Sequence, residues 1–221
     1  RWDGNLRLLL GKVSNQHTHG IKKMLLLVTS AQLDHLNEMR TKEYEQTIEW
    51  AKVKDKEGYN VVWLETISNT EPSYLKGQFP CYCTDNHNPN YQNKGSNLGM
   101  AMRKFFEDCE VDDDYAMYLT GRYHFTKNTF FDIMEANPDC DFYGMNDGND
   151  QYFTGCFAMK KKYMIDWLNK TNWHNVNANM INFEQTLWDY VKGNSLYTCE
   201  VEDMYMDCNV FGAGNPVRLT R

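Results

Sequence analysis

Residues 115–123 read YAMYLTGRY, an apolar run that ends in a glycine and an arginine. The run from Tyr115 to Leu119 is typical of a buried strand, because parallel strands that are covered on both faces are apolar almost throughout. The chain leaves the core directly after this run. The stretch therefore predicts a core strand that delivers Gly121 and Arg122 to the edge of the sheet.

Other apolar runs alternate with amphipathic segments on both sides of this stretch. We expect strands at 24–31, 59–66, 79–86, 140–145, 152–159 and 196–201, and helices at 41–58, 95–109, 126–136, 161–169 and 183–191. Ser96 is the expected cap of the second helix, and Gly58 is the expected stop of the first. Alternating strands and helices predict an α/β fold in one domain, with a mostly parallel central sheet flanked by helices on both faces.

The composition restricts the partners and the location of the protein. The formal net charge of −7 argues against a nucleic-acid partner, since nucleic-acid-binding proteins usually carry a basic face. The longest apolar run, 24–28, is too short to span a bilayer, so no transmembrane segment is expected. Seven scattered cysteines favour reduced thiols over a disulfide framework, which predicts a cytoplasmic location.

The first twenty residues show no clear periodicity. We interpret 1–20 as a leader or an irregular segment and 21–221 as the folded domain. His17 and His19 offer a metal-binding alternative, but no carboxylate or third histidine lies nearby in the sequence. The leader is the favoured interpretation.

Polar residues follow the predicted strands. Because ligands of open α/β sheets bind outside the carboxyl ends of the strands, these residues are candidates for one site. They are Thr29 and Ser30, Glu65 and Thr66, Asp85 and Asn86, Thr120 to Arg122, and Asn146 and Asp147.

Asn93, Lys94 and Gly95 stand directly before the second predicted helix. Backbone N–H groups at a helix start, together with a lysine, suit a phosphate group. The alternative is that Gly95 only makes a turn and that Lys94 is a solvated charge. The sequence contains neither a P-loop nor a dinucleotide-binding glycine motif.

Arg122 is a stronger candidate for phosphate binding than the loop at 93–95. A guanidinium matches phosphate oxygens with a rigid fork, and Gly121 would let a ligand approach the backbone. The alternative is a structural ion pair with Asp147 or with the acidic run 112–114. That run precedes its strand, so we interpret it as a solvated turn rather than a metal site.

Glu184 lies in the first turn of the last predicted helix. A carboxylate there interacts favourably with the helix dipole, and this alone can explain its presence. The alternative is a general base held at the start of the helix and facing the site.

The NKG loop at 93–95 and the strand that ends in TGRY at 120–123 resemble a group of GT-A-type glycosyltransferase-like proteins from bacteria, algae and large DNA viruses. The similarity extends over roughly 24–200. It implies a nucleotide-binding half at about 24–125 and an acceptor half at about 126–210. By position, Thr29, Ser30 and Glu65 would surround the nucleoside, and the NKG loop would face the ribose and the diphosphate.

Most GT-A enzymes carry an Asp-x-Asp metal motif where this chain has Thr120, Gly121 and Arg122. The departure predicts that Arg122, helped by Lys94, partly replaces the divalent ion as the clamp on the leaving diphosphate. No cofactor is therefore expected. A divalent metal such as Mn or Mg remains possible but is not expected to be essential.

The resemblance implies a hexosyl- or pentosyltransferase. It would move a sugar from a nucleotide-sugar donor to an acceptor hydroxyl of a glycan or glycoconjugate, with Glu184 or Asp147 as the base. The first alternative is a catalytically inactive nucleotide- or sugar-binding module. The second is a nucleotidyltransferase, which normally needs a metal held by carboxylates.

Overall fold

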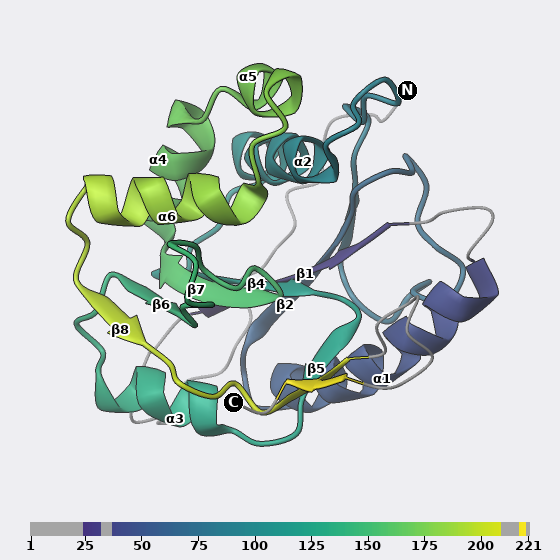
Figure 1. The fold of residues 1–221 in the computed structure, drawn as a ribbon. Coiled ribbons are helices and arrows are strands. Elements are labelled where there is room, and N and C mark those ends of the chain that lie inside the picture. Colours follow the sequence, from purple (N-terminus) through teal and green to yellow (C-terminus); the bar gives the residue numbers. More distant parts are fainter. Residues whose placement is uncertain (1–23, 32–36, 209–216, 220–221) are drawn as a thin grey trace.

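A seven-stranded sheet lies between two layers of helices (Figure 1). The computed structural model describes residues 24–31, 37–208 and 217–219. The predicted leader at 1–20, with His17 and His19, lies outside these residues. The α/β architecture predicted from the sequence is confirmed, including helices on both faces.

The strand order in the large sheet is β3-β2-β1-β4-β7-β6-β8. The bounds are β1 Met24–Ser30, β2 Asn60–Glu65, β3 Cys81–Cys83, β4 Tyr115–Thr120, β6 Phe142–Gly144, β7 Cys156–Lys160 and β8 Thr198–Glu200. β7 pairs antiparallel with both β4 and β6, whereas the other pairs are parallel. The connection from β6 to β7 contains no helix, and a short connection joins antiparallel neighbours.

Helices cover both faces of the sheet, so that successive side chains of β1 are buried on opposite faces. Helices α1 Asn37–Lys56 and α3 Thr129–Ala136 cover one face, and α2 Lys94–Asp108, α4 Lys161–Lys170, α5 Trp173–Ala178 and α6 Phe183–Gly193 cover the other (Figure 1). Leu26 and Val28 belong to the core on the α1 side, and Leu25 and Leu27 to the core on the α2 side. Burial on both sides explains the continuous apolar run in the sequence.

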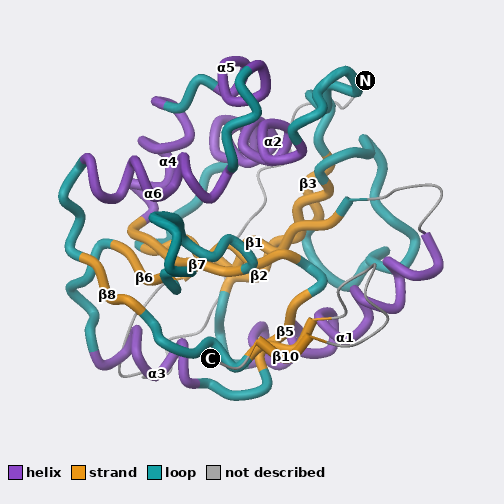
Figure 2. Tube along the Cα trace, viewed as in Figure 1, coloured by secondary structure: helices purple, strands orange, loops and turns teal. Residues whose placement is uncertain are grey.

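A second, three-stranded sheet was not predicted. It consists of β5 Tyr123–Phe125, β9 Met206–Cys208 and β10 Val217–Leu219, in the order β10-β9-β5. It lies beside α1, on the lower side of the large sheet in Figure 2. Helix α5 was also missed. Such short elements carry too few residues to establish a hydrophobic period.

The second predicted helix begins differently from the expectation. Asn93, not Ser96, is the N-cap of α2, and its Oδ1 accepts hydrogen bonds from the N–H groups of Gly95 (2.9 Å) and Ser96 (3.3 Å). Ser96 lies buried in the first turn, and its hydroxyl has no partner among the described residues. The predicted stop after α1 is confirmed, because Gly58 adopts a φ of 95° just beyond the helix.

Two further observations concern the membrane and the thiols. Within the described ranges, no helix combines the length and the apolar character that crossing a bilayer requires. Cys81, Cys83, Cys109, Cys140, Cys156 and Cys199 are free thiols.

Candidate functional site

The carboxyl ends of β1, β2 and β4 bring several predicted site residues to one edge of the sheet. In the pairing register, Thr29 lies opposite Thr120 and Ser30 lies opposite Glu65. Because β7 is antiparallel, its starting end reaches the same edge, where the N–H of Thr120 donates to the carbonyl oxygen of Gly155 at 2.9 Å.

Tyr118 of β4 connects Thr29 and Thr120 through its hydroxyl group. Its buried hydroxyl accepts a hydrogen bond from Thr29 Oγ1 at 3.4 Å and lies 2.9 Å from Thr120 Oγ1. Burial raises the pKa of Tyr118, the two hydroxyl contacts and the charge of Arg122 oppose the rise, and the charge of Glu184 adds to it. The charges of Arg122 and Glu184 thus act on the pKa of the same phenol in opposite directions. Tyr118 was missed as a site residue because the sequence gives it the apolar pattern of a core strand.

Arg122 is partly exposed and has no hydrogen bond or ion pair with any residue that the structure describes. The acids proposed as alternative partners are engaged elsewhere. Asp113 accepts from Asn60 Nδ2 at 2.8 Å before β4 begins, at the opposite edge of the sheet. Asp147 accepts from the N–H of Asn149 (3.0 Å) and from Gln151 Nε2 (2.5 Å). Within the described residues, the structural ion pair of Arg122 does not form.

Gly121 permits a close approach of protein backbone. Its N–H donates to the carbonyl oxygen of Thr29 at 2.7 Å. A Cβ at this position would lie 2.6 Å from that oxygen and 3.2 Å from the rings of Trp63 and Tyr44. The sequence predicts that Gly121 lets a ligand approach the backbone, and in the structure the neighbour at this position is the end of β1. The glycine thereby fixes the position from which Arg122 emerges.

Glu65 is fully buried and holds the turn after β2. Its Oε2 accepts from Ser30 Oγ at 2.6 Å, and its Oε1 accepts from the N–H groups of Ile67 (3.0 Å) and Ser68 (3.2 Å). These contacts join the ends of β1 and β2 into one rigid edge.

The NKG loop packs on the segment between α5 and α6. Asn93 Nδ2 donates to the carbonyl oxygen of Ile181 at 2.7 Å, and the N–H of Asn93 donates to Asn177 Oδ1 at 3.1 Å. A Cβ on Gly95 would lie 2.7 Å from the Cβ of Phe183, so only glycine permits this packing. The exposed Lys94 therefore lies beside the start of α6, without an ion pair to any described residue.

Glu184 follows Phe183 in the first turn of α6 and is half-buried. Its Oε1 accepts a hydrogen bond from Thr154 Oγ1 at 2.5 Å. Thr154 immediately precedes Gly155, whose carbonyl binds the end of β4. Glu184 is thereby connected to the same sheet edge as Thr120.

Asp147 lies on a different part of this edge, in the connection between β6 and β7. Gly148 and Asp150 in that connection have φ values of 88° and 52°, which make it a tight turn. The two candidate bases thus differ in their support: Glu184 lies on a helix, and Asp147 on a turn.

The residues at the end of β4 do not fit a divalent metal. They offer a threonine hydroxyl, a glycine backbone and a guanidinium, and a guanidinium repels a cation and cannot ligate it. Across the part of the chain that the structure describes, no three or more His, Cys, Asp or Glu side chains gather as a metal site would require.

Comparisons with known proteins identify the fold. The chain has a TM-score of 0.54 and 12% identity to a glycosyltransferase involved in the glycosylation of the major capsid of PBCV-1, and the match covers 81% of each chain. It also resembles the galactosyltransferase LgtC (TM-score 0.45, 10% identity, 80% of this chain and 73% of LgtC). A third match is the CTP:phosphocholine cytidylyltransferase LicC from Streptococcus pneumoniae (TM-score 0.46, 14% identity, 85% and 93%). No family model and no curated protein sequence matches the chain.

The match to the PBCV-1 protein establishes a GT-A-type α/β fold for this chain. At such low identity the likeness concerns the fold, and the chemistry has to be argued from the residues themselves.

Proposed function

We propose that the protein is a glycosyltransferase that moves a hexosyl or pentosyl group from a nucleotide-sugar donor to a hydroxyl of a glycan or glycoconjugate. The observation that carries the proposal is Arg122: a guanidinium that has no partner among the described residues, at the carboxyl edge of a GT-A-type sheet. A permanent cation in such a place suits a diphosphate, which a bidentate arginine binds strongly.

The donor would lie across the carboxyl ends of β1, β2 and β4, in a nucleotide-binding half at about 24–125. Thr29, Ser30 and the loop held by Glu65 would border the nucleoside. Asn93, Lys94 and Gly95 would face the ribose and the diphosphate, and Thr120, Gly121 and Arg122 would hold the diphosphate from the other side. The rigid hydrogen bonds at this edge support that arrangement, because they preorganise the binding groups.

In the reaction, the acceptor oxygen would form a bond to the anomeric carbon while the bond from that carbon to the diphosphate breaks. The diphosphate would leave with the electron pair, and Arg122 and Lys94 would stabilise its charge. In an inverting reaction, Glu184 would take the acceptor proton, with Asp147 as the second candidate. The half-buried position of Glu184 and its bond to Thr154 favour the former, since a base must be held in a fixed orientation.

The first test is nucleotide binding. UDP, GDP, CDP and dTDP at millimolar concentration should be added separately while thermal unfolding is recorded, and at least one should raise the melting temperature by mass action. The shift should persist when EDTA replaces manganese, because the proposed clamp is an arginine. Unmoved melting curves with all four nucleotides would disprove the donor site, and a shift that vanishes on chelation would disprove the metal-independent clamp.

A nucleotide- or sugar-binding module without turnover is the second candidate. The replacement of an acid pair by Thr120, Gly121 and Arg122 favours it, because a site that lost its metal can also lose its chemistry. Release of free sugar from a bound nucleotide-sugar separates the two: a transferase hydrolyses its donor slowly, and a binding module does not. We also propose a cytoplasmic location, supported by the free thiols of the cysteines whose side chains the structure describes.

A further inference from the structure

Two segments beside the proposed site have an unusual composition. Residues 86–93 (NHNPNYQN) and 171–182 (TNWHNVNANMIN) each contain five asparagine or glutamine side chains. Neither segment contains Asp, Glu, Lys or Arg, although 24% of the whole chain is charged. We name these two segments together the amide surface.

The two segments interlock although they are far apart in the sequence. The hydroxyl of Tyr91 forms a short hydrogen bond with Nδ1 of His174, and the two rings meet edge to face at 5.7 Å. The N–H of Asn93 donates to Asn177 Oδ1 at 3.1 Å, and Asn93 Nδ2 to the carbonyl oxygen of Ile181 at 2.7 Å. The amide surface is therefore one continuous structure.

Part of the amide surface faces solvent with unused hydrogen-bonding groups. Asn88, Asn93, Asn172 and Asn177 use their side chains to bind backbone groups of the surface itself. By contrast, the side chains of Asn90, Gln92 and Asn182 are exposed and form no hydrogen bond with the residues that the structure describes. The first four asparagines hold the loops of the surface together, whereas the amides of Asn90, Gln92 and Asn182 have no partner among the described residues that a ligand would have to displace.

The amide surface also adjoins the proposed transfer site directly. Its first segment ends at Asn93, next to Lys94, and its second segment ends at Asn182, two residues before Glu184. Gly95 and Phe183, which follow the two ends, are in contact. The surface therefore ends at the N-cap of the helix that carries Glu184.

From this placement we infer that the amide surface binds the acceptor, and that the acceptor is a neutral glycan. The inference rests on the proposed function for the role of the glycan as acceptor. A side-chain amide both donates and accepts hydrogen bonds, which matches sugar hydroxyls, and it attracts neither sign of charge. The net charge of −7 repels sialylated, sulfated or uronic-acid glycans. A protein partner is a poorer fit, because protein interfaces are enriched in aromatic residues and arginine.

The test uses oligosaccharides without any donor, so that acceptor binding is measured alone. Maltotriose, cellotriose and N,N′-diacetylchitobiose serve as neutral probes, and sialyllactose and a heparin disaccharide as anionic probes, in saturation-transfer NMR at millimolar concentration. At least one neutral probe should bind, and more strongly than either anionic probe. No binding of any neutral probe, or stronger binding of an anionic one, would overturn the inference.

A variant locates the binding on the protein. Combining Asn90→Ala, Gln92→Ala and Asn182→Ala should weaken the neutral probe about tenfold or more, because each neutral hydrogen bond contributes roughly a factor of two to ten. Gln46→Ala, an exposed amide on α1 across the sheet, is the matched control and should bind as the unmodified protein does. Unchanged binding in the triple variant would overturn the inference, and each single variant repeats the test if the triple variant does not fold.

Nucleoside diphosphate binding is measured on the same samples. Glycan binding without nucleotide binding would contradict the proposed transferase and leave the amide surface as a glycan site. Nucleotide binding without glycan binding would contradict only the inference made here about the acceptor.

Discussion

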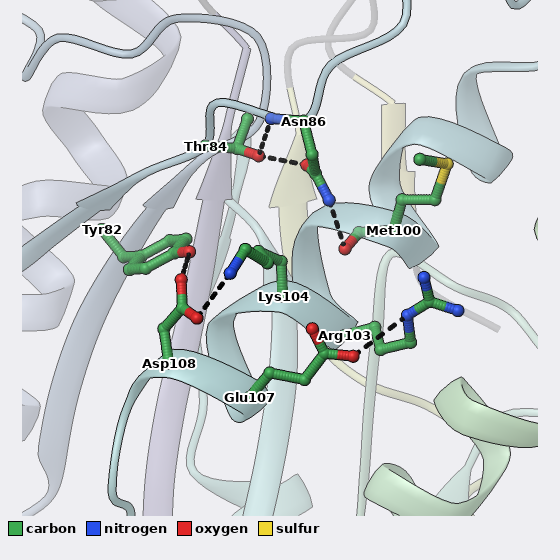
Figure 3. A network of polar contacts seen from close by, with 8 residues as sticks. All are labelled: Tyr82, Thr84, Asn86, Met100, Arg103, Lys104, Glu107 and Asp108. Carbon is green, nitrogen blue, oxygen red and sulfur yellow. Dashed lines mark hydrogen bonds and ion pairs between the residues drawn. The ribbon is translucent and has the colours of Figure 1, made fainter.

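The outer face of α2 and the carboxyl edge of the sheet place their charges in opposite ways. On α2, Lys104 Nζ lies 2.6 Å from Asp108 Oδ1, Asp108 Oδ2 accepts from Tyr82 at 2.6 Å, and Arg103 Nε lies 3.4 Å from Glu107 Oε1 (Figure 3). At the sheet edge, Arg122 has no such partner among the described residues. One arginine is matched within its own helix, and the other is not.

The difference separates charges that serve the fold from charges that serve a ligand. Pairs one turn apart on an exposed helix stabilise it slightly and keep its surface soluble. A partly buried arginine without a partner contributes no such stability, although its neighbours Gly121 and Thr120 are rigidly fixed. A charged side chain that is partly buried usually has a partner, and Arg122 has none among the described residues. Such departures are expected at functional sites.

The largest expected effect concerns Glu184. Glu184→Gln should lower glycosyl transfer by about 10²- to 10⁴-fold while donor binding is retained, because the amide keeps the shape and the bond from Thr154 but cannot take a proton. Transfer is measured as nucleoside diphosphate released in the presence of acceptor. Glu107→Gln on the outer face of α2 is the matched control and should leave the rate unchanged. Normal turnover in Glu184→Gln would assign the base to Asp147.

Removal of Arg122, which has no partner among the described residues, should have the next largest effect. Arg122→Ala should weaken nucleoside diphosphate binding by roughly 10- to 100-fold, since charge-assisted hydrogen bonds contribute about 1.5–3 kcal/mol and ~1.4 kcal/mol is tenfold. Arg122→Lys should restore only part of the affinity, because the charge remains but the fork is lost. Binding is measured by calorimetry.

Arg103→Ala is the control for this comparison, since it removes the same charge from the paired face. It should bind the nucleotide normally. Equal affinity of a folded Arg122→Ala protein and of Arg103→Ala would show that Arg122 is not the clamp.

The sequence predicted the elements that have a long apolar period and the edge at which the site residues gather. Those inferences depend only on alternation and on the direction of parallel strands, which local patterns determine. It did not predict β5, α5 or the antiparallel direction of β7, because short elements and strand direction are decided by tertiary packing. Tyr118 and Thr154 were missed for a related reason: their importance comes from contacts with Thr29 and Glu184, residues far away in the sequence.

Asp141 combines features of the two regions, because its charge is paired like those on α2 and its side chain is largely buried. Asp141 is only 17% exposed in its side chain and accepts from Lys160 Nζ at 2.9 Å and from the N–H of Tyr197 at 3.1 Å, which joins β6, β7 and β8. Burial raises the pKa of Asp141, but the bonds from Lys160 and Tyr197 outweigh it and the net shift is downward. Asp141→Asn should therefore lower the free energy of unfolding by about 1–2 kcal/mol at neutral pH.

The stability that Asp141 contributes should depend on pH in a defined direction. A carboxylate with a lowered pKa in the folded protein stabilises the fold above its unfolded value of about 3.9, and this stability is lost as the pH falls through the lower folded value. The difference between the unmodified protein and Asp141→Asn in urea unfolding should thus be constant near neutrality and shrink below about pH 4. A difference that grew on acidification would contradict the assignment.

The smallest effect is expected on the paired face of α2. Lys104 and Asp108 have side chains that are 35% and 40% exposed, so water screens their attraction and both lose side-chain freedom when they pair. Lys104→Ala should change the free energy of unfolding by less than about 0.5 kcal/mol, and the change should diminish further at high salt. Urea unfolding at low and high ionic strength measures both. A loss above ~1 kcal/mol would mean that this face, too, holds charges on which the fold depends, and pairing within a helix would then no longer distinguish the solvated charges from the functional ones.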